Sequence, residues 1–197
     1  MAYFKNGQRK GSEPGDLPVA YMVKLSAHLD EQDARAAARY FSAMKPMPWI
    51  RVVETAAVPQ THVAGWMLVV NQPVVKEAIG KRIIETPENF ERTELRDDAS
   101  GFVAYVPPES LPKGKVLVTT GGGKTIPCAT CHGRDLRGKD ATPSIAGRSP
   151  SYMVRQLYDM QRGSRAGATT LLMRAPVAQL TLDDMVAIAA YLASLRP

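Results

Sequence analysis

The stretch Cys128-Ala129-Thr130-Cys131-His132 constrains this chain more than any other feature, because it contains both cysteines of the 197 residues. The pattern C-x-x-C-H is the attachment signature of c-type haem: two thiols bind the haem vinyl groups covalently, and the imidazole that follows binds the iron. A five-residue pattern also occurs by chance, but here it accounts for every cysteine. The sequence therefore predicts one haem c attached at Cys128 and Cys131, with His132 as the proximal iron ligand.

Three other uses of two closely spaced cysteines are open: a redox dithiol, a disulfide, or half of a zinc site. A zinc site needs further Cys or His ligands, and the chain has only His28 and His62 besides His132, both far upstream. A thioredoxin-type dithiol needs a strand and helix in a βαβ unit, and it gives His132 no role. Haem attachment is the interpretation that uses all three residues.

An electron-carrying low-spin haem needs a sixth ligand, which is commonly a methionine thioether. Met153, Met160 and Met185 fall at apolar positions of predicted helices, where Met usually fills core space. Met173 lies in the stretch 169–176, which is predicted to be a loop just before the last helix. Since a loop can fold over the distal haem face, Met173 is the best candidate for the distal ligand.

These features resemble the class I cytochromes c, and more closely the small bacterial cytochrome c553/c4 group. The resemblance covers about residues 115–197 and rests on an ordered set: the haem motif with Gly133, residues 143–147, Tyr152 with Gln156 and Leu157, residues 163–165, Met173 with Pro176 and Val177, and residues 180–195. It implies a mainly α-helical domain and His132/Met173 ligation.

The same resemblance implies further site residues. The carbonyl of Pro143 is expected to accept the ring N–H of His132, which would fix its tautomer. Arg148 and Tyr152 are expected to contact the cofactor. Arg148 departs from the pattern of the group, which usually has Gln after Ala-Gly, so the polar contacts at the haem edge are expected to differ here.

The N-terminal segment repeats the C-terminal one. Residues 22–46 align without a gap on residues 173–197, so that Met22 matches Met173 and Tyr40 matches Tyr191, and residues 4–11 resemble residues 160–167. Both copies predict a helix with a polar N-cap, Asp30 in the first and Thr181 in the second, each followed by Asp three residues later. Residues 1–46 are therefore predicted to be a partial cytochrome c repeat without its own haem motif, with Met22 at the distal-ligand position. We expect a truncated di-haem cytochrome whose coding sequence continues upstream with a second C-x-x-C-H and a secretion signal.

Residues 47–112 differ in character, with β-branched and aromatic runs at 49–53, 65–70, 81–85 and 101–106. They predict short strands in an extended connector that joins two cytochrome units. His62 is expected to be structural, and residues 107–112 are expected to link the connector to the cytochrome domain at 113–197.

The run 115–125 is glycine-rich near its end, but the phosphate-binding pattern needs Gly where the chain has Val118, so we reject a P-loop. We predict instead a flexible lead into a haem helix that starts near Pro127. Ser149 and Pro150 predict the start of another helix as N-cap and first residue, with Met153, Leu157 and Met160 on its inner face.

The charge is unevenly distributed along the chain. Residues 113–197 hold 12 Lys/Arg and 5 Asp/Glu, a net charge of +7, whereas the whole chain has a net charge of +6. This predicts either steering toward an acidic redox partner or a solvated surface that offsets the haem propionates. No nucleic-acid-binding motif accompanies the charge. No apolar run reaches the ~20 residues of a membrane-spanning helix, and the N-terminus has no apolar signal-peptide core.

The sequence as a whole predicts an electron-transfer c-type cytochrome, not an enzyme, located in the bacterial periplasm where haem is normally attached. Two alternatives stay open. One is a cytochrome subunit of a dehydrogenase complex, and the other is a haem enzyme or sensor with a labile sixth ligand.

Overall fold

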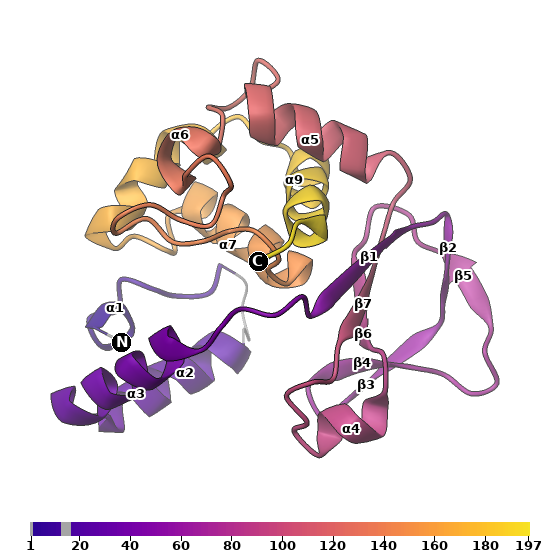
Figure 1. Cartoon of the computed structure of the whole chain (residues 1–197), viewed down its shortest axis with the longest axis horizontal. Helices are drawn as coiled ribbons and strands as arrows, with labels where there is room; N and C mark the ends of the chain where they lie inside the picture. The colour runs from indigo at the N-terminus through magenta and orange to yellow at the C-terminus, as the bar shows by residue number, and fades with distance from the viewer. Residues whose placement is uncertain (1, 13–16) are drawn as a thin grey trace. The chain divides into compact units, whose positions relative to one another are not determined.

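The computed structural model describes residues 2–12 and 17–197, which form two compact units (Figure 1). The first unit combines Met1–Pro46 with Arg155–Ala178, and the second combines Met47–Val154 with Gln179–Pro197. The N-terminal segment thus forms a unit with part of the predicted cytochrome domain, while the haem motif and the last helix belong to the second unit.

The described part of the first unit is helical. Its elements are α1 (Ala2–Lys5), α2 (Leu17–His28), α3 (Glu31–Ala43), the latter part of α7 (Pro150–Arg162), the 3-10 helix η1 (Ala168–Met173) and α8 (Arg174–Val177). The prediction of a loop around Met173 is wrong, since Met173 ends η1 and directly precedes α8. Pro176 misleads here because it falls in the first turn of α8, where its missing N–H is not needed.

The first unit contains matched backbone hydrogen bonds at the two predicted repeat copies. The Gly7 N–H donates to Phe4 O (3.2 Å) as the Gly163 N–H donates to Met160 O (3.3 Å). The two segments also pair with each other antiparallel at Arg9 and Arg165. There the Lys10 N–H donates to Ser164 O and the Ala166 N–H donates to Gln8 O, both at 2.8 Å. Each bond maps onto its partner when 156 is added to the first copy's numbers, so the two segments have the same local conformation.

The two repeat copies differ in the residues that connect these segments to α3 and to the last helix, α9 (Leu182–Ser194). Met22 lies inside the continuous helix α2, whereas its counterpart Met173 lies where η1 meets α8. α3 and α9 match again, each with 13 residues and a polar N-cap.

The second unit joins a β module to the helices around the haem motif. Its strands are β1 (Ile50–Glu54), β2 (Ala57–Pro59), β3 (Thr61–Ala64), β4 (Met67–Val70), β5 (Lys76–Ala78), β6 (Ile84–Pro87) and β7 (Phe102–Val106). Its helices are α4 (Phe90–Glu94), α5 (Ser110–Thr120), α6 (Ala129–His132), the first residues of α7, and α9.

The β module has a three-stranded sheet of order β1-β7-β6, in which β1 and β7 run parallel and β6 is antiparallel to β7. β2 pairs with β5 and β3 with β4, both antiparallel. Val58, Ile79 and Ile84 form a buried cluster, against which Leu68 and Tyr105 pack. Short strands lie at or beside all four predicted runs, as β1, β4, β6 and β7, and residues 47–106 fold further into a module with its own core. The predicted strand at 81–85 begins only at Ile84, because Arg82 is held in a turn on the carbonyls of Ala78 and Ile79.

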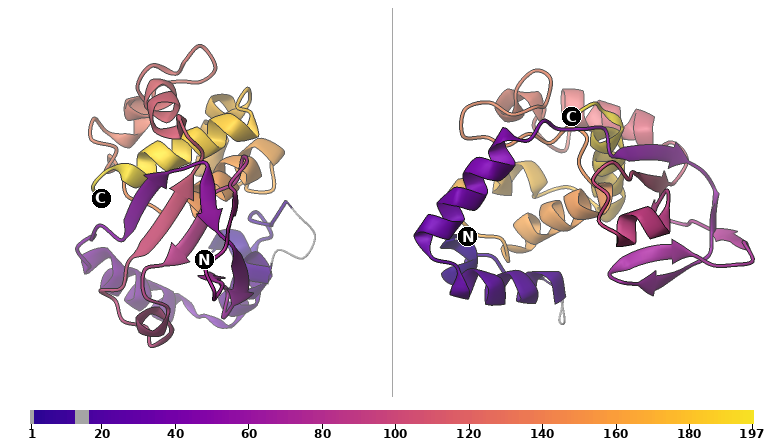
Figure 2. Two further views of the ribbon diagram at one scale, coloured as in Figure 1. Left: turned by 90° about the vertical axis from the view of Figure 1, so that its right-hand side faces the viewer. Right: turned by 60° about the horizontal axis from the view of Figure 1, so that its bottom comes forward.

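Two carboxylates of the β module bind the N-terminal ends of helices in the same unit. Glu54 Oε1 accepts the N–H of Leu111 in the first turn of α5 (2.7 Å). Glu85 Oε2 accepts the hydroxyl of Ser149 (2.9 Å), the N-cap residue of α7. Negative charge is favourable at a helix N-terminus because the first N–H groups have no partner within the helix. α9 also packs against β1, as the two views of Figure 2 show.

The predicted linker 107–112 and flexible lead are also wrong, because most of this stretch forms α5. α5 packs on α9 along its length. Gly114 makes the close approach possible, since a Cβ there would lie 2.0 Å from Ala187 O and 2.7 Å from Tyr191 Cβ. Pro112 is tolerated because it lies in the first turn. As predicted, α9 starts with a capping box between Thr181 and Asp184.

Candidate haem-attachment site

The haem motif is held by the helix that precedes it. The N–H of Cys128 donates to the carbonyl of Val118 near the end of α5 (2.9 Å), and the N–H of His132 donates to Cys128 O (2.9 Å), closing one helical turn. The two thiols therefore leave the same turn of α6, and the imidazole follows directly. Gly121 ends α5 with φ +80, a left-handed conformation that glycine adopts without strain.

His132 is buried, with 8% of its surface exposed, and its ring lies against the loop that follows. Its Nδ1 is 2.8 Å from the carbonyl oxygen of Pro143, which is the predicted hydrogen bond. A carbonyl only accepts, so Nδ1 carries the proton and the lone pair of Nε2 is available to a metal. Gly138 lets the loop fold back, because its φ is +96 and a Cβ there would lie 2.8 Å from Thr142 O.

Leu136 anchors the same loop and was not predicted from the sequence. Its side chain is buried, and its backbone has φ +62, an uncommon value for a branched residue. Its carbonyl accepts the N–H groups of Ile145 and Ala146, and the N–H of Gly147 donates to Leu192 O in α9. These bonds place Pro143 under His132. No local sequence signal marks a leucine for this role, since its bonds reach nine and ten residues ahead.

Asp184 ties together three parts of the site and was predicted only as a helix cap. Its buried carboxylate is 2.8 Å from Lys113 Nζ on α5 and 2.7 Å from Lys124 Nζ, four residues before Cys128. It also accepts the hydroxyl and the N–H of Thr181. Burial, the largest single influence, acts to raise the pKa of Asp184. The combined hydrogen bonds from Lys113, Lys124 and Thr181 outweigh it and hold the pKa well below its usual range.

The environment of the cysteines tests two alternatives to haem attachment, a redox dithiol and a zinc site. Burial raises the pKa of the Cys128 thiol to about 11, so the thiol stays protonated at neutral pH. A redox dithiol needs the opposite, a lowered thiolate pKa. Within residues 2–12 and 17–197, no group of three or more His, Cys, Asp and Glu side chains is arranged to hold a metal ion. A four-ligand zinc site is thus not assembled in the described part of the chain.

The structure places the remaining predicted residues as follows. Arg148 is exposed just after Gly147, and Tyr152 is 39% exposed in the first turn of α7. The predicted N-cap of α7 is confirmed, since Ser149 Oγ accepts the Tyr152 N–H (3.2 Å). Met153 and Leu157 are buried on that helix and Met160 is half-buried. Met173 and Met22, both half-buried, belong to the first unit.

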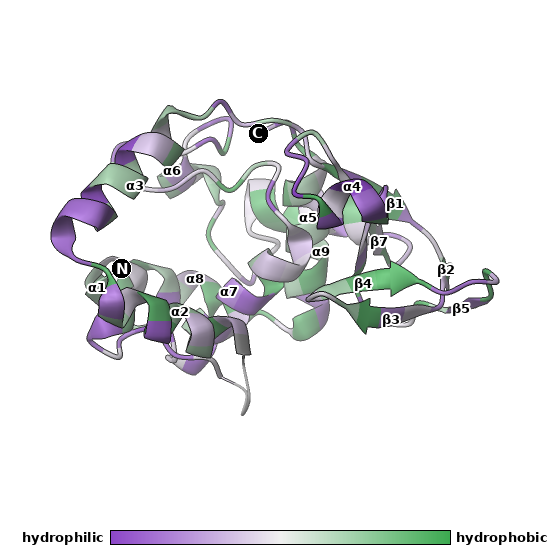
Figure 3. Ribbon diagram, turned by 90° about the horizontal axis from the view of Figure 1, so that it is seen from below, coloured by the Kyte–Doolittle hydropathy of each residue, from purple (hydrophilic) through white to green (hydrophobic). Residues whose placement is uncertain are grey.

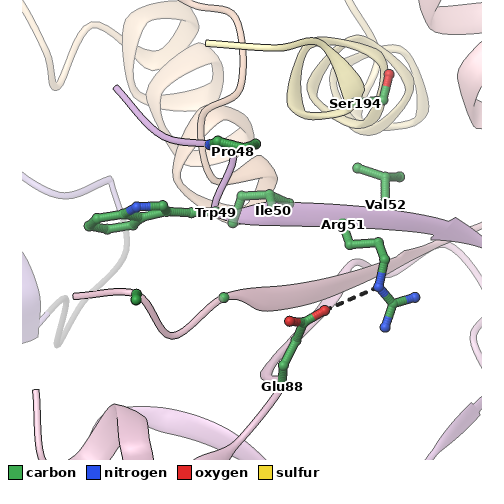
Figure 4. Close-up of a pocket in the computed structure, with 9 residues that line it drawn as sticks. Pro48, Trp49, Ile50, Arg51, Val52, Glu88 and Ser194 are labelled. Carbon is green, nitrogen blue, oxygen red and sulfur yellow. Dashed lines mark hydrogen bonds and ion pairs between the residues drawn. The ribbon is translucent and has the colours of Figure 1, made fainter. Parts of the chain in front are cut away.

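A separate cleft of the second unit lies beside β1 (Figure 4). Trp49, Ile50 and Val52 line one side, and Ser194 at the end of α9 lines another. The charges of Arg51 and Glu88 neutralise each other there at 3.1 Å. None of its residues was predicted as a site residue.

The residues around His132 fit a covalently bound haem. Two thiols on one turn are the donor set for thioether attachment, and the buried imidazole has its Nδ1 hydrogen-bonded so that Nε2 can bind iron. α5, which packs on α9, holds this motif through the bond from the Cys128 N–H to Val118 O. The fold and the site together define the class of c-type haem proteins.

Comparisons with known proteins indicate the same class. The family model described as Cytochrome c matches residues 113–196. A cytochrome subunit of sulfide dehydrogenase from Chlorobaculum tepidum is 32% identical over 101 residues, which are 51% of this chain and 89% of that protein. The chain belongs to the cytochrome c family. A cytochrome c4 from Azotobacter vinelandii is 28% identical over 141 residues, covering 64% of this chain and 66% of the relative. The chain thus matches just under two thirds of the length of this cytochrome c4.

Solved structures show the same fold. A cytochrome c4 from Acidithiobacillus ferrooxidans superimposes with a TM-score of 0.57 at 20% identity, covering 98% of this chain and 79% of the other. A thiosulfate dehydrogenase from Marichromatium purpuratum gives a TM-score of 0.57 at 24% identity, covering this whole chain but 29% of the other. No single helix in the described ranges is long and apolar enough to cross a membrane.

Proposed function

We propose that this protein carries single electrons on a haem c bound at Cys128 and Cys131, with His132 and Met173 as axial ligands. The observation that carries the proposal is the buried His132. It lies on the helical turn that also presents both cysteines, and its Nδ1 is hydrogen-bonded to the carbonyl of Pro143. When bound, haem c supplies a one-electron couple between Fe(II) and Fe(III). Covalent attachment of this kind takes place outside the bacterial cytoplasm in the family, so we propose a periplasmic location.

The protein's own residues have separable tasks in this proposal. Pro143 fixes the tautomer of His132, so that Nε2 is the ring nitrogen that faces iron. Leu136 holds the loop that carries Pro143. Asp184 fixes α5 and the segment before Cys128 to α9 through Lys113 and Lys124.

The ligand assignment is tested by replacing Met173. A ferric haem with a thioether sulfur ligand has a weak far-red absorption band, and we expect Met173→Ala to remove it and to let the ferrous protein bind CO. Met160→Ala, at a half-buried methionine on α7, is the matched control and should keep the band. Loss of the band in Met160→Ala but not in Met173→Ala would reassign the ligand. Ready CO binding by the unmodified ferrous protein would instead favour a haem sensor with a labile sixth ligand.

We also propose that the basic residues of 113–197 steer the protein toward an acidic redox partner. Arg134, Arg137 and Lys139 are exposed within ten residues of the haem motif. Reduced protein should therefore react faster with anionic ferricyanide at low salt and slower as salt rises, while cationic tris-phenanthroline cobalt(III) should show the opposite trend. Arg134→Glu with Arg137→Glu should reduce both trends, and Lys76→Glu on β5 should not. Equal salt trends for the two oxidants would remove the steering idea.

A second candidate function is that of a cytochrome subunit in a dehydrogenase complex. It is favoured by the 32% identity to the protein named as the cytochrome subunit of sulfide dehydrogenase, of which this chain covers 89%. Purification of the tagged, haem-loaded protein under native conditions separates the two. A subunit brings a second chain in stoichiometric amount, and a free carrier elutes alone.

We further propose that residues 1–46 are a partial second cytochrome repeat. Support comes from the hydrogen bonds of Gly7 and Gly163, from the Arg9–Arg165 pairing, and from the equal lengths of α3 and α9. The continuous helix α2 at Met22 departs from this pattern. A pyridine haemochrome assay that counts haem per chain tests the proposal, since a partial repeat without a motif predicts one haem in this chain.

A further inference from the structure

The hairpin formed by β3 and β4 turns at two residues, Gly65 and Trp66, which connect the paired residues Ala64 and Met67. Both turn residues have positive φ, +53 and +78, the combination of a type I′ turn. Glycine or asparagine is usual at such positions, and a bulky residue there is a genuine outlier. Trp66 is also 70% exposed. The residue therefore combines backbone strain with exposure of the largest apolar side chain, and strain of this kind gathers at functional sites.

The stretch of sequence that contains Trp66 has no charged residue. Residues 55–75 form a run of 21 residues without Asp, Glu, Lys or Arg. Four large apolar side chains of this run are exposed: Val63 (74%), Trp66 (70%), Val74 (54%) and Val75 (50%). Seen from below in Figure 3, β4 has the colour of hydrophobic residues. Surfaces that face water normally carry about a quarter to a third of charged residues, so this hairpin is built for a different environment.

We propose that the β3–β4 hairpin lies in the headgroup region of a phospholipid membrane, with Trp66 as its anchor. Tryptophan is enriched at the membrane–water interface because its ring is apolar and its N–H is polar. An uncharged apolar element can enter the outer ~5–10 Å of a bilayer without moving a charge out of water. The hairpin then attaches the protein from one side, without a spanning segment.

The size of the patch favours lipid over a protein partner. A standard protein interface takes about 800 Å² from each partner, whereas an aromatic side chain contributes at most ~150–250 Å² and three valines less. Four partly exposed side chains therefore supply about half of what a stable protein interface needs. A redox partner would also gain little here, because within the second unit the hairpin and α6 lie at different ends (Figure 1).

The charge of the module indicates how the binding should depend on salt. Residues 47–106 hold 6 Lys/Arg and 8 Asp/Glu, so the module itself is not attracted to anionic lipid. Binding through the hairpin should therefore occur on zwitterionic phosphatidylcholine and persist at high salt. Binding through the basic residues of 113–197 would need anionic lipid and would be lost at high salt.

The test uses the full haem-loaded chain and phosphatidylcholine vesicles, with and without phosphatidylglycerol, in a flotation assay at low and high salt. Trp49→Phe is the matched control, because Trp49 is 46% exposed but lies outside the hairpin. It should bind like the unmodified protein, and it leaves Trp66 as the single tryptophan. Its emission should shift to the blue on vesicles and be quenched by lipids brominated in the upper acyl chain.

Trp66→Gly separates binding from folding. Glycine adopts the left-handed conformation without strain, so Tm should be unchanged or raised, while the partition coefficient should fall about tenfold or more. A lowered Tm would show that Trp66 packs structurally, and binding that survives in Trp66→Gly would place the lipid contact elsewhere; either result overturns the proposal. Binding only to anionic vesicles at low salt would assign it to the basic residues. A further outcome is that the protein shows no vesicle binding but self-associates in a way that Trp66→Gly abolishes. That result would identify a second copy of this chain, not lipid, as the partner of the hairpin.

Discussion

α3 and α9 have the same sequence pattern, but α9 is largely buried and α3 is exposed to solvent. Each has 13 residues, begins after a polar N-cap, and ends with an N–H donating to the carbonyl three residues back at 3.3 Å. α9 buries Met185, Ile188 and Leu192, and it packs on both α5 and β1. α3 buries no residue, and its Tyr40 and Phe41 are each 67% exposed. An amphipathic pattern thus shows which face of a helix can be buried, but only a partner such as α5 determines that it is.

The largest test of this contrast compares Leu192 with Phe41, which occupy equivalent positions in the two helices. Leu192 is 1% exposed, so Leu192→Ala should lower the free energy of unfolding by about 2–5 kcal/mol through lost burial and a cavity. Phe41→Ala should change it by no more than about 0.5 kcal/mol, because the ring is already in water. Denaturant unfolding followed by circular dichroism measures both. A large loss in Phe41→Ala would mean that α3 is covered in solution, and the contrast would be broken.

A smaller effect is expected at the contact that only α9 makes. Gly114→Ala would place a Cβ 2.0 Å from Ala187 O, so α5 must move away from α9. We expect a loss of about 3 kcal/mol, at the upper end of overpacking effects. The neighbouring Lys115→Ala is the control, since Lys115 is exposed on the same helix. If Gly114→Ala were neutral, close packing of α5 would not be what distinguishes α9 from α3.

What could be predicted from the sequence follows the range of the interactions. The haem motif, the Thr181 cap and the Ser149–Pro150 helix start depend on neighbours within a few residues, and the structure contains them all. The Pro143–His132 bond spans 11 residues and was inferred from resemblance rather than from spacing. α5 was missed because Pro112 and Gly114 disfavour a helix locally, and only packing on α9 explains Gly114. The parallel pairing of β1 with β7 joins residues about 50 positions apart, which no local pattern encodes.

The third test is the acid sensitivity of the ion pairs of Asp184. The folded-state pKa of Asp184 lies below the unfolded value of about 3.9. A lowered pKa stabilises the fold above the unfolded value, and this contribution is lost as pH falls below it. At pH 7, Asp184→Asn should cost about 2 kcal/mol, because Lys113 and Lys124 lose their charged partner.

The cost of Asp184→Asn should therefore depend on pH. Below about pH 4 the unfolding free energies of Asp184→Asn and the unmodified protein should begin to converge. Asp33→Asn on the exposed α3 is the control at pH 7 and should cost little. Urea unfolding between pH 7 and pH 2.5 follows the difference for Asp184→Asn. A gap for Asp184→Asn that stays constant across this range would rule out the ion pairs as its origin.

The smallest effect separates the two N-caps, which are nearly the same in geometry. Asp30 Oδ1 accepts the Asp33 N–H at 2.8 Å, and Thr181 Oγ1 accepts the Asp184 N–H at 3.2 Å. Loss of either cap should destabilise its own helix by about 1 kcal/mol. Because α9 unfolds with the core, Thr181→Ala should shift the global unfolding midpoint. α3 has no buried residue to couple it to that core, so Asp30→Ala should leave the midpoint in place and appear only as faster amide hydrogen exchange within α3. Equal midpoint shifts in the two variants would show that α3 and α9 unfold as one cooperative structure in spite of their different burial.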